Sequence, residues 1–158
     1  MSEPPPPAAS FGRPKVRPHI LVVTDDASLS VFLAEGLLYG GFWTSVIASG
    51  LQALEVFRLR DFDLIIVDAD LGGIGAIETI QRLRGLSDRA APGDPRTDAP
   101  IVLVTEQSSD VTTPAHIWTA LNVVQVLTAP LELEVIAPRL HAILERWDES
   151  QSDRDLTH

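Results

Sequence analysis

The chain has 158 residues, of which 45% are hydrophobic and 22% are charged, and this is enough for one domain with a substantial core. Because it contains no cysteine, disulfides, thiolate metal sites and cysteine nucleophiles are excluded. The formal net charge of −10 argues against non-specific binding to nucleic acid, and no apolar run approaches the roughly 20 residues of a membrane span. The N-terminus has no apolar signal core, and we expect a cytoplasmic protein without nucleic-acid or membrane partners.

The N-terminal segment, residues 1–17, is rich in proline and small residues. It cannot bury enough apolar surface to order itself, so we expect a disordered tail. Its basic residues Arg13, Lys15 and Arg17, followed by His19, are interrupted by prolines. We interpret this cluster as part of a solvated linker rather than as a phosphate-binding arm.

Short apolar runs rich in β-branched residues alternate with helical patterns along the rest of the chain. The predicted strands are residues 19–23, 42–48, 64–67, 100–104 and 123–127. Five helices are predicted. The first is capped by Asp26 or Ser28 and ends at Gly40, the second is capped by Ser49, and the third covers residues 74–84. The fourth has Thr113 as its cap and Pro114 at its first position, and the fifth covers residues 131–147. Between them, residues 85–99 are rich in Gly, Pro and Asp and predict a long loop.

The last helical pattern contains a proline. Pro138 lacks the N–H that would bond to Glu134, which predicts a kink or a late helix start. From Asp148 onward the chain is polar and acidic, and we expect residues 148–158 to fray. The ordered domain is therefore expected to cover residues 18–147.

Buried strands that alternate with helices are typical of the α/β class, in which helices cover both faces of a parallel sheet. Right-handed crossovers then give a (βα)₅ three-layer sandwich, and we expect a flavodoxin-like sheet of strand order 2-1-3-4-5. Ligands of such sheets bind outside the carboxyl ends of the strands, at the switch point between the first and third strands. Asp25, Asp26 and Asp68 follow those two strands and are expected to converge there.

Asp68 stands directly after the apolar run 64–67 and before a turn that contains Gly72. A carboxylate in this place is positioned for a role in a functional site, although an aspartate that only initiates the turn is an alternative interpretation. The expected convergence favours a functional site at Asp68. Thr105 ends the fourth strand and is expected to face the same crevice.

The strand ends and turns carry a set of short segments in a fixed order. They are residues 20–26 (ILVVTDD), 41–42 (GF), 50–54 (GLQAL), 62–68 (FDLIIVD), 83–84 (LR), 100–105 (PIVLVT) and 127–130 (LTAP). Taken together, they make residues 18–147 resemble the receiver domain of two-component response regulators, the CheY-like family. The resemblance covers nearly all of the chain that is expected to be ordered.

The resemblance implies that Asp68 accepts a phosphoryl group from a histidine kinase or phosphotransfer protein. It also implies a Mg²⁺ ion held by an acidic residue after the first strand (Asp25, with Asp26 as an alternative), by Asp68 and by the backbone carbonyl of Asp70. Thr105 would bind a phosphoryl oxygen through its hydroxyl. A metal ion and a hydroxyl group are needed because a carboxylate that attacks phosphorus brings negative charge toward negative charge. Positioning and charge neutralisation therefore dominate the catalysis.

The sequence departs from the family pattern at several of these places. The lysine that normally pairs with the phosphoryl group is replaced by Ala129, and Pro130 after it is the family's place for a cis peptide. The acidic pair falls on Thr24 and Asp25, and the aromatic switch position is Val126. Fewer carboxylate ligands should lower the affinity for Mg²⁺, and the missing cation should weaken phosphoryl transfer.

We therefore expect a stand-alone, atypical receiver of phosphorelay signalling that is weakly phosphorylated or not phosphorylated at all. It would act through a downstream protein partner or as a homodimer. One alternative is a phosphorylation-independent pseudo-receiver that serves as an interaction or dimerisation module. Another is a flavodoxin-like enzyme or small-ligand binder, against which stand the lack of a Gly-rich phosphate loop after the first strand and of a His or Ser constellation for hydrolysis.

Overall fold

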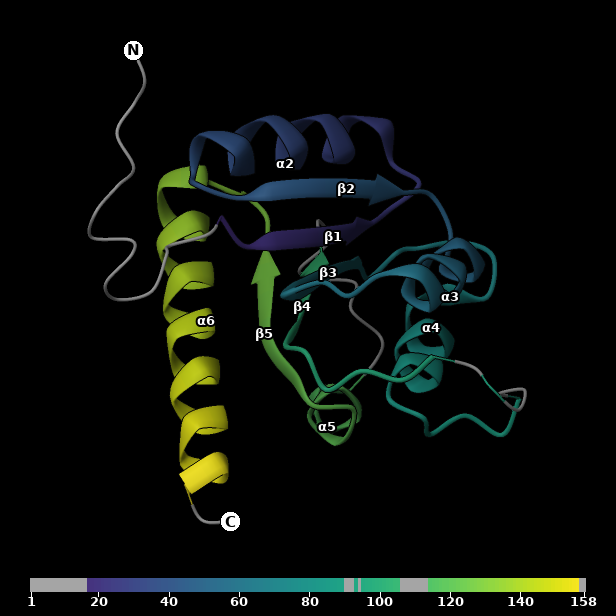
Figure 1. The fold of residues 1–158 in the computed structure, drawn as a ribbon. Coiled ribbons are helices and arrows are strands. Elements are labelled where there is room, and N and C mark those ends of the chain that lie inside the picture. Colours follow the sequence, from purple (N-terminus) through teal and green to yellow (C-terminus); the bar gives the residue numbers. More distant parts are fainter. Residues whose placement is uncertain (1–16, 90–92, 94, 106–113, 157–158) are drawn as a thin grey trace.

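The computed structural model describes residues 17–89, 93, 95–105 and 114–156 (Figure 1). Within these residues, strands and helices alternate along the chain. The strands are β1 (His19–Val23), β2 (Trp43–Ile47), β3 (Leu64–Asp68), β4 (Ile101–Thr105) and β5 (Val123–Thr128). The helices are α2 (Ala27–Tyr39), α3 (Gly50–Leu59), α4 (Gly75–Leu83), α5 (Ala115–Ala120) and α6 (Leu133–Leu156).

The strands form one sheet of order β2-β1-β3-β4-β5, and every pair of neighbours is parallel. The α/β class and the strand order 2-1-3-4-5 predicted from the sequence are thus confirmed. The register aligns Val23 with Val67, Asp68 with Val104 and Thr105 with Thr128. As a result, the residues that follow these strands lie along one edge of the sheet.

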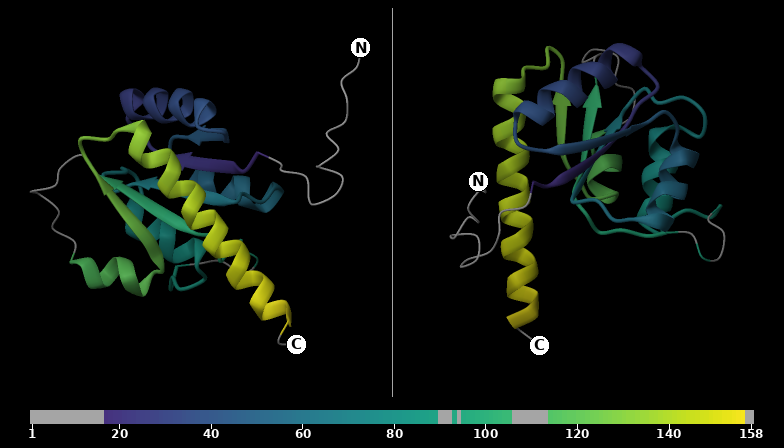
Figure 2. Two further views of the ribbon diagram at one scale, coloured as in Figure 1. Left: turned by 90° about the vertical axis from the view of Figure 1, so that its left-hand side faces the viewer. Right: turned by 45° about the horizontal axis from the view of Figure 1, so that its top comes forward.

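Both faces of the sheet are covered by helices. Helices α2 and α6 lie on one face, and α3, α4 and α5 lie on the other (Figure 2). Successive residues of β1 and β3 enter opposite cores: Leu21 and Ile65 pack toward α3 and α4, whereas Ile20 and Leu64 pack toward α2 and α6. This two-sided burial explains why the central strands are continuous apolar runs rather than alternating patterns.

Side-chain caps fix two of the helix starts that the sequence predicts. Asp26 Oδ1 accepts hydrogen bonds from the backbone N–H groups of Ser28 (2.9 Å) and Leu29 (3.1 Å) at the start of α2. Ser49 Oγ accepts one from the N–H of Gln52 (3.1 Å) at the start of α3. Of the two residues considered for the first cap, Asp26 therefore has that role.

The end of α6 differs from the prediction. The helix continues to Leu156, so the expected end at Trp147 and the expected fraying of residues 148–156 are wrong. The segment is polar, but it contains no proline or glycine to end a helix, and a solvated helix tolerates such residues. The start at Leu133 is two residues later than expected, and the helix runs through Pro138 without interruption.

The N-terminal boundary also needs a correction. Residues 1–16 lie outside the described part of the chain, but Arg17, which we placed in the disordered tail, belongs to the folded domain. Its Nη1 donates to the carbonyl oxygens of Leu38 (3.0 Å) and Phe42 (3.4 Å), and its guanidinium lies 4.9 Å from the ring centroid of Trp43. Cations are favoured at the carbonyl end of a helix such as α2, which explains this contact.

Helix α5 begins at Ala115, with Pro114 as the residue that precedes its first turn rather than as its first residue. The predicted cap, Thr113, lies outside the described residues. Trp118 and Leu121 are buried in the core that α5 shares with α4 and the sheet.

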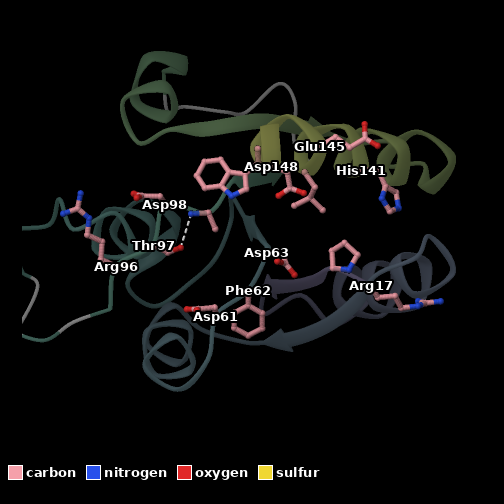
Figure 3. A pocket seen from close by; sticks show the side chains of 14 residues that line it. Arg17, Asp61, Phe62, Asp63, Arg96, Thr97, Asp98, His141, Glu145 and Asp148 are labelled. Carbon is pink, nitrogen blue, oxygen red and sulfur yellow. Dashed lines mark hydrogen bonds between the residues drawn. The ribbon is translucent and has the colours of Figure 1, made fainter. Parts of the chain in front are cut away.

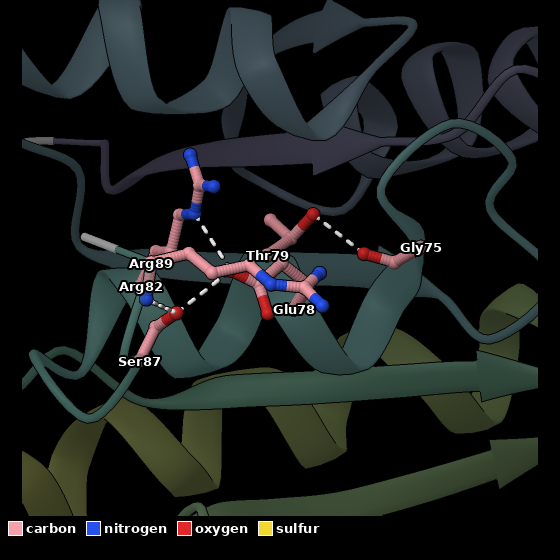
Figure 4. A network of polar contacts seen from close by, with 6 residues as sticks. All are labelled: Gly75, Glu78, Thr79, Arg82, Ser87 and Arg89. Carbon is pink, nitrogen blue, oxygen red and sulfur yellow. Dashed lines mark hydrogen bonds and ion pairs between the residues drawn. The ribbon is translucent and has the colours of Figure 1, made fainter. Parts of the chain in front are cut away.

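Helix α4, which directly follows the turn after Asp68, is tied down at its far end by a polar network (Figure 4). Arg82 Nε and Ser87 Oγ both donate to Glu78 Oε2, each at 2.7 Å. These two donors hold the pKa of Glu78 below its ordinary value, with the Ser87 hydrogen bond as the larger cause. The network fixes the chain where it leaves α4.

Candidate functional site

Three polar side chains are buried at the carboxyl edge of the sheet. Asp68 is the last residue of β3 and is 5% exposed, while Thr24 follows β1 and Thr105 ends β4, each at 3% exposure. Because β1 and β4 are the two neighbours of β3, Thr24 and Thr105 flank Asp68 on either side. The buried polar residues of this edge thus surround one carboxylate.

The Asp68 carboxylate accepts a hydrogen bond at each of its oxygens. Thr24 Oγ1 donates to Oδ2 at 2.6 Å, and the backbone N–H of Asp70 donates to Oδ1 at 2.9 Å. Thr24 Oγ1 in turn accepts from the backbone N–H of Asp26 at 3.0 Å. The side chain of Asp68 is therefore oriented by two neutral donors, one from the end of β1 and one from its own turn.

Asp25 reaches the same turn from β1, although its side chain is exposed. Its Oδ2 accepts from the backbone N–H of Gly72 at 3.2 Å, and a Cβ on Gly72 would lie only 3.0 Å from that oxygen. Glycine at this position thus permits the close approach. The turn from Asp68 to Gly72 links Asp25 and Asp68, two of the three acids that were expected to converge, while Asp26 caps α2.

The residues available for a metal ion are fewer than the family pattern has. Asp26 is engaged as the cap of α2, and Thr24 supplies a hydroxyl where the pattern has an acid. Within the described ranges, no three His, Cys, Asp or Glu side chains are grouped so that they could hold a metal. What remains for a hard cation such as Mg²⁺ is Asp25, Asp68 and the backbone carbonyl of Asp70, so the residues fit the ion only in part.

The loop after β5 lies beside Thr105 and carries no cation. The N–H of Ala129 donates to the carbonyl oxygen of Thr105 at 2.9 Å, and the Ala129–Pro130 peptide bond is cis. Among the described residues, no Lys or Arg forms an ion pair with Asp68. The only lysine of the sequence, Lys15, lies outside the described part of the chain.

Val126 of β5, at the position where the family has an aromatic residue, is 41% exposed. A small cavity of about 340 Å³ lies next to it and is lined by the end of β5, the Pro130–Leu131 turn and the first turns of α6. The exposed Val135 of α6 lines the same cavity, whose walls also include the polar residues Thr128, Glu132 and Arg139. Two exposed valines, one from β5 and one from α6, therefore lie at an accessible surface of mixed polarity.

A larger cavity of about 810 Å³ lies at the opposite, amino-terminal edge of the sheet (Figure 3). It is formed between α6 and the segments that precede β1, β3 and β4, and it is lined by acids that include Asp61, Asp98 and Asp148. This cavity was not predictable from the sequence, because its walls come from four separate segments. Its position at the other end of the strands separates it from Asp68.

His19, at the same amino-terminal edge, is a structural histidine. Arg60 Nη2 lies 2.9 Å from its Nδ1, and Ser45 Oγ lies 2.8 Å from its Nε2. Because a guanidinium can only donate, Nδ1 is the acceptor and Nε2 carries the hydrogen. The pKa of His19 is lowered, first by burial and second by the charge of Arg60, while the charge of Asp63 acts in the opposite direction.

The family model of the response regulator receiver domain matches residues 20–141. The match covers most of the chain and includes β1 from its second residue onward and the whole of β2 to β5. The chain therefore belongs to the response regulator receiver domain family, a family of signalling domains in two-component systems.

Several known proteins are similar to the chain. The DNA-binding response regulator MtrA of Mycobacterium tuberculosis (strain ATCC 25618 / H37Rv) is 30% identical over 138 residues, which are 87% of this chain and 55% of MtrA. The structure described as adenylate cyclase from Rhodopirellula baltica has a TM-score of 0.72 and 26% identity, and the match covers 90% of this chain and 98% of that one.

The chemotaxis response regulator CheY4 of Vibrio cholerae has a TM-score of 0.66 at 22% identity, covers 81% of this chain and 99% of its own, and shares the fold. The chain spans about half the length of MtrA. Within the described residues, no helix combines the length and the apolar character that crossing a membrane would require.

Proposed function

We propose that this receiver accepts a phosphoryl group on Asp68 from a histidine kinase or phosphotransfer protein, at a rate well below that of a receiver with a complete site. The observation that carries the proposal is the place of Asp68: a buried carboxylate at the end of β3, flanked by two threonines and oriented by hydrogen bonds at both oxygens. A carboxylate fixed in this way is positioned as an attacking group.

The transfer step would proceed by in-line displacement. An oxygen of Asp68 forms a bond to phosphorus, the P–N bond of the donor phosphohistidine breaks, and its electron pair returns to the imidazole nitrogen. Thr105, the buried residue that ends the neighbouring strand, would bind a phosphoryl oxygen through its hydroxyl. The product is an acyl phosphate on Asp68, with the protein otherwise unchanged in bonding.

Two features slow this step. Position 129 offers a methyl group where a cation would offset the incoming negative charge, and Thr24 replaces an acidic residue. We propose Asp25, Asp68 and the carbonyl of Asp70 as the ligands of a weakly bound Mg²⁺, which when bound would neutralise charge at the phosphoryl oxygens. With fewer acidic ligands and no cation, both the affinity for the ion and the stabilisation of the transition state fall.

The signal would pass to a downstream protein or to a second copy of the chain. The surface formed by Val126 and Val135 is suited to such a contact, because it joins β5 to α6 and includes Pro130, the residue after Ala129. We also propose a cytoplasmic location, on the basis of the cysteine-free composition and the resemblance to cytoplasmic signalling domains.

A second candidate function is that of a pseudo-receiver, which signals by protein contact without phosphorylation. The observation in its favour is that the described residues place no cation against Asp68 and that its carboxylate is already served by two internal donors. In this case the surface formed by Val126 and Val135 would bind the partner in the unphosphorylated form only.

Phosphorylation by acetyl phosphate distinguishes the two. The full chain is incubated with the donor and Mg²⁺, and intact-mass spectrometry follows the addition of one phosphoryl group. We expect slow, Mg²⁺-dependent addition that Asp68→Asn abolishes and that Asp63→Asn, at the other end of β3, leaves unchanged. If neither acetyl phosphate nor a phosphorylated histidine kinase domain modifies the wild type, the phosphoacceptor proposal is wrong and the pseudo-receiver remains.

A further inference from the structure

The hydroxyl of Thr24 makes two hydrogen bonds, and together they direct its hydrogen toward Asp68. Its oxygen accepts from the N–H of Asp26 at 3.0 Å, and its hydrogen is donated to Asp68 Oδ2 at 2.6 Å. A hydroxyl has a single hydrogen, and the Asp26 N–H occupies a lone pair, so the remaining contact to Asp68 takes that hydrogen. A separation of 2.6 Å is within the range of charge-assisted O–H···O⁻ bonds.

The backbone keeps this hydroxyl in place. Thr24 donates its own N–H to the carbonyl oxygen of Ile47 at 3.0 Å, which extends the β1–β2 ladder by one residue. The side chain is 3% exposed, so it lies among packed neighbours that leave it little room to rotate. The Thr24–Asp68 contact is therefore a fixed part of the folded edge rather than one of several surface conformations.

Asp68 is a buried acid, and a buried carboxylate needs hydrogen-bond donors or a counter-ion. The described residues provide no ion pair to it, but they provide the Thr24 hydroxyl at one oxygen and the Asp70 N–H at the other. An acidic residue in place of Thr24 would add a metal ligand and remove a donor. Threonine does the reverse, because it removes a ligand and adds a donor.

We infer that Thr24 is a specificity-determining residue that makes the resting Asp68 site independent of Mg²⁺. Its hydroxyl serves the buried carboxylate as a bound cation would, so the site is folded and satisfied without the ion. The inference rests on the proposed function only in taking Asp68 as the central group of the site. The Thr24–Asp68 contact would also account for the weak binding of Mg²⁺ that we propose.

The test compares the Mg²⁺ dependence of the melting temperature in Thr24 variants, with no phosphoryl donor present. Circular dichroism is the readout, because it follows the unfolding of the whole domain. The wild type and Thr24→Ser, which keeps the hydroxyl, should shift by less than about 1 °C at about 10 mM MgCl₂.

Thr24→Val keeps the shape and removes the donor. Without Mg²⁺ its melting temperature should fall by about 5 °C, and Mg²⁺ should restore a clear part of that loss, because the carboxylate now lacks its donor. Thr24→Asp should bind Mg²⁺ at least about tenfold more tightly than the wild type, since ligand charge sets the affinity of such sites. Isothermal titration calorimetry gives the dissociation constant of Mg²⁺ for Thr24→Asp and for the wild type directly. This comparison tests the inference even if Thr24→Val does not fold.

Two controls locate the effect. Thr119→Asp adds the same charge on the exposed surface of α5 and should leave the Mg²⁺ response at the wild-type level, and Asp68→Asn in the Thr24→Asp background should remove the gain. The inference is overturned if the wild type responds to Mg²⁺ as strongly as Thr24→Asp, or if Thr24→Val melts at the wild-type temperature. Neither result depends on whether Asp68 is phosphorylated, so the proposed function stands or falls separately.

Discussion

Arg84 is a buried cation that holds three segments of the chain together, and replacing it should be among the most damaging single changes. It is 6% exposed and donates four hydrogen bonds to backbone carbonyl oxygens: Leu121 (3.0 Å), Thr97 (2.9 Å), Ala99 (2.8 Å) and Asn122 (3.0 Å). These acceptors belong to the end of α5 and to the segment before β4, which lie on either side of the end of α4.

The magnitude follows from the burial of those bonds. The bonds to Leu121 and Ala99 are buried, and a hydrogen bond to a charged group contributes about 1.5–3 kcal/mol, so the two alone account for about 3 kcal/mol or more. The bonds to Thr97 and Asn122 are partly accessible, and water can replace the donor there. Removing the guanidinium also relieves the cost of its burial, which lowers the pKa of Arg84, so we expect Arg84→Met to lose about 3 kcal/mol net.

Urea denaturation measures this loss as a shift in the midpoint at constant slope. With a slope of about 2 kcal/mol per molar urea, the midpoint of Arg84→Met should fall by about 1.5 M. Arg82→Met, two residues earlier on the same helix, is the matched control and should cost less, because its partner Glu78 keeps the Ser87 donor. A loss below about 1 kcal/mol for Arg84→Met would refute the role assigned to the four carbonyl contacts.

Two further predictions concern packing and pH. A Cβ on Gly50 would collide with Oγ1 of Thr79, which is buried and bonded to the Gly75 carbonyl, so Gly50→Ala should destabilise the fold by about 1–3 kcal/mol. A double-mutant cycle with Thr79→Ala should show a coupling of at least about 0.5 kcal/mol, and strict additivity would contradict the contact. The pKa of His19 is lowered in the folded protein, so the unfolded chain takes up the proton first as the pH falls. The contribution of His19 to the free energy of unfolding is therefore complete above about pH 6.5 and is lost as the pH falls below that value. Urea denaturation between pH 7.5 and 5.5 should therefore show a steeper loss in the wild type than in His19→Gln, and equal slopes would contradict it.

The fold was predictable because its determinants are local and repeated. Each buried parallel strand is a short run of β-branched and apolar residues, such as Leu64 to Val67, and the residue after each run marks the carboxyl edge. The candidate site was predictable as a neighbourhood for the same reason. Asp25, Asp68 and Thr105 were placed on one rim by strand order alone, and the register puts them there.

The contacts within that neighbourhood were not predictable. The partner of Asp68 is Thr24, 44 residues earlier. The sequence placed Thr24 at one of the family's two acidic positions, but nothing in it indicates that the hydroxyl donates to Asp68. Arg84 was visible as part of a Leu-Arg pair, but its burial among four carbonyl oxygens depends on where a distant loop and turn come to lie. The end of α6 was not predictable from the polarity of its last residues, because an exposed helix needs no apolar face to continue.

The central claim is that Asp68 is an acceptor whose reactivity is limited by the missing cation at position 129. The most direct measurement is the rate of phosphoryl addition from acetyl phosphate to Ala129→Lys and to the wild type, followed by intact-mass spectrometry, with Thr128→Lys as the matched control on the adjacent residue. Ala129→Lys should accelerate addition by about a hundredfold, the typical effect of one charge-stabilising group, and Asp68→Asn should abolish it in both backgrounds. An unchanged rate in Ala129→Lys, or addition that survives Asp68→Asn, would contradict the account.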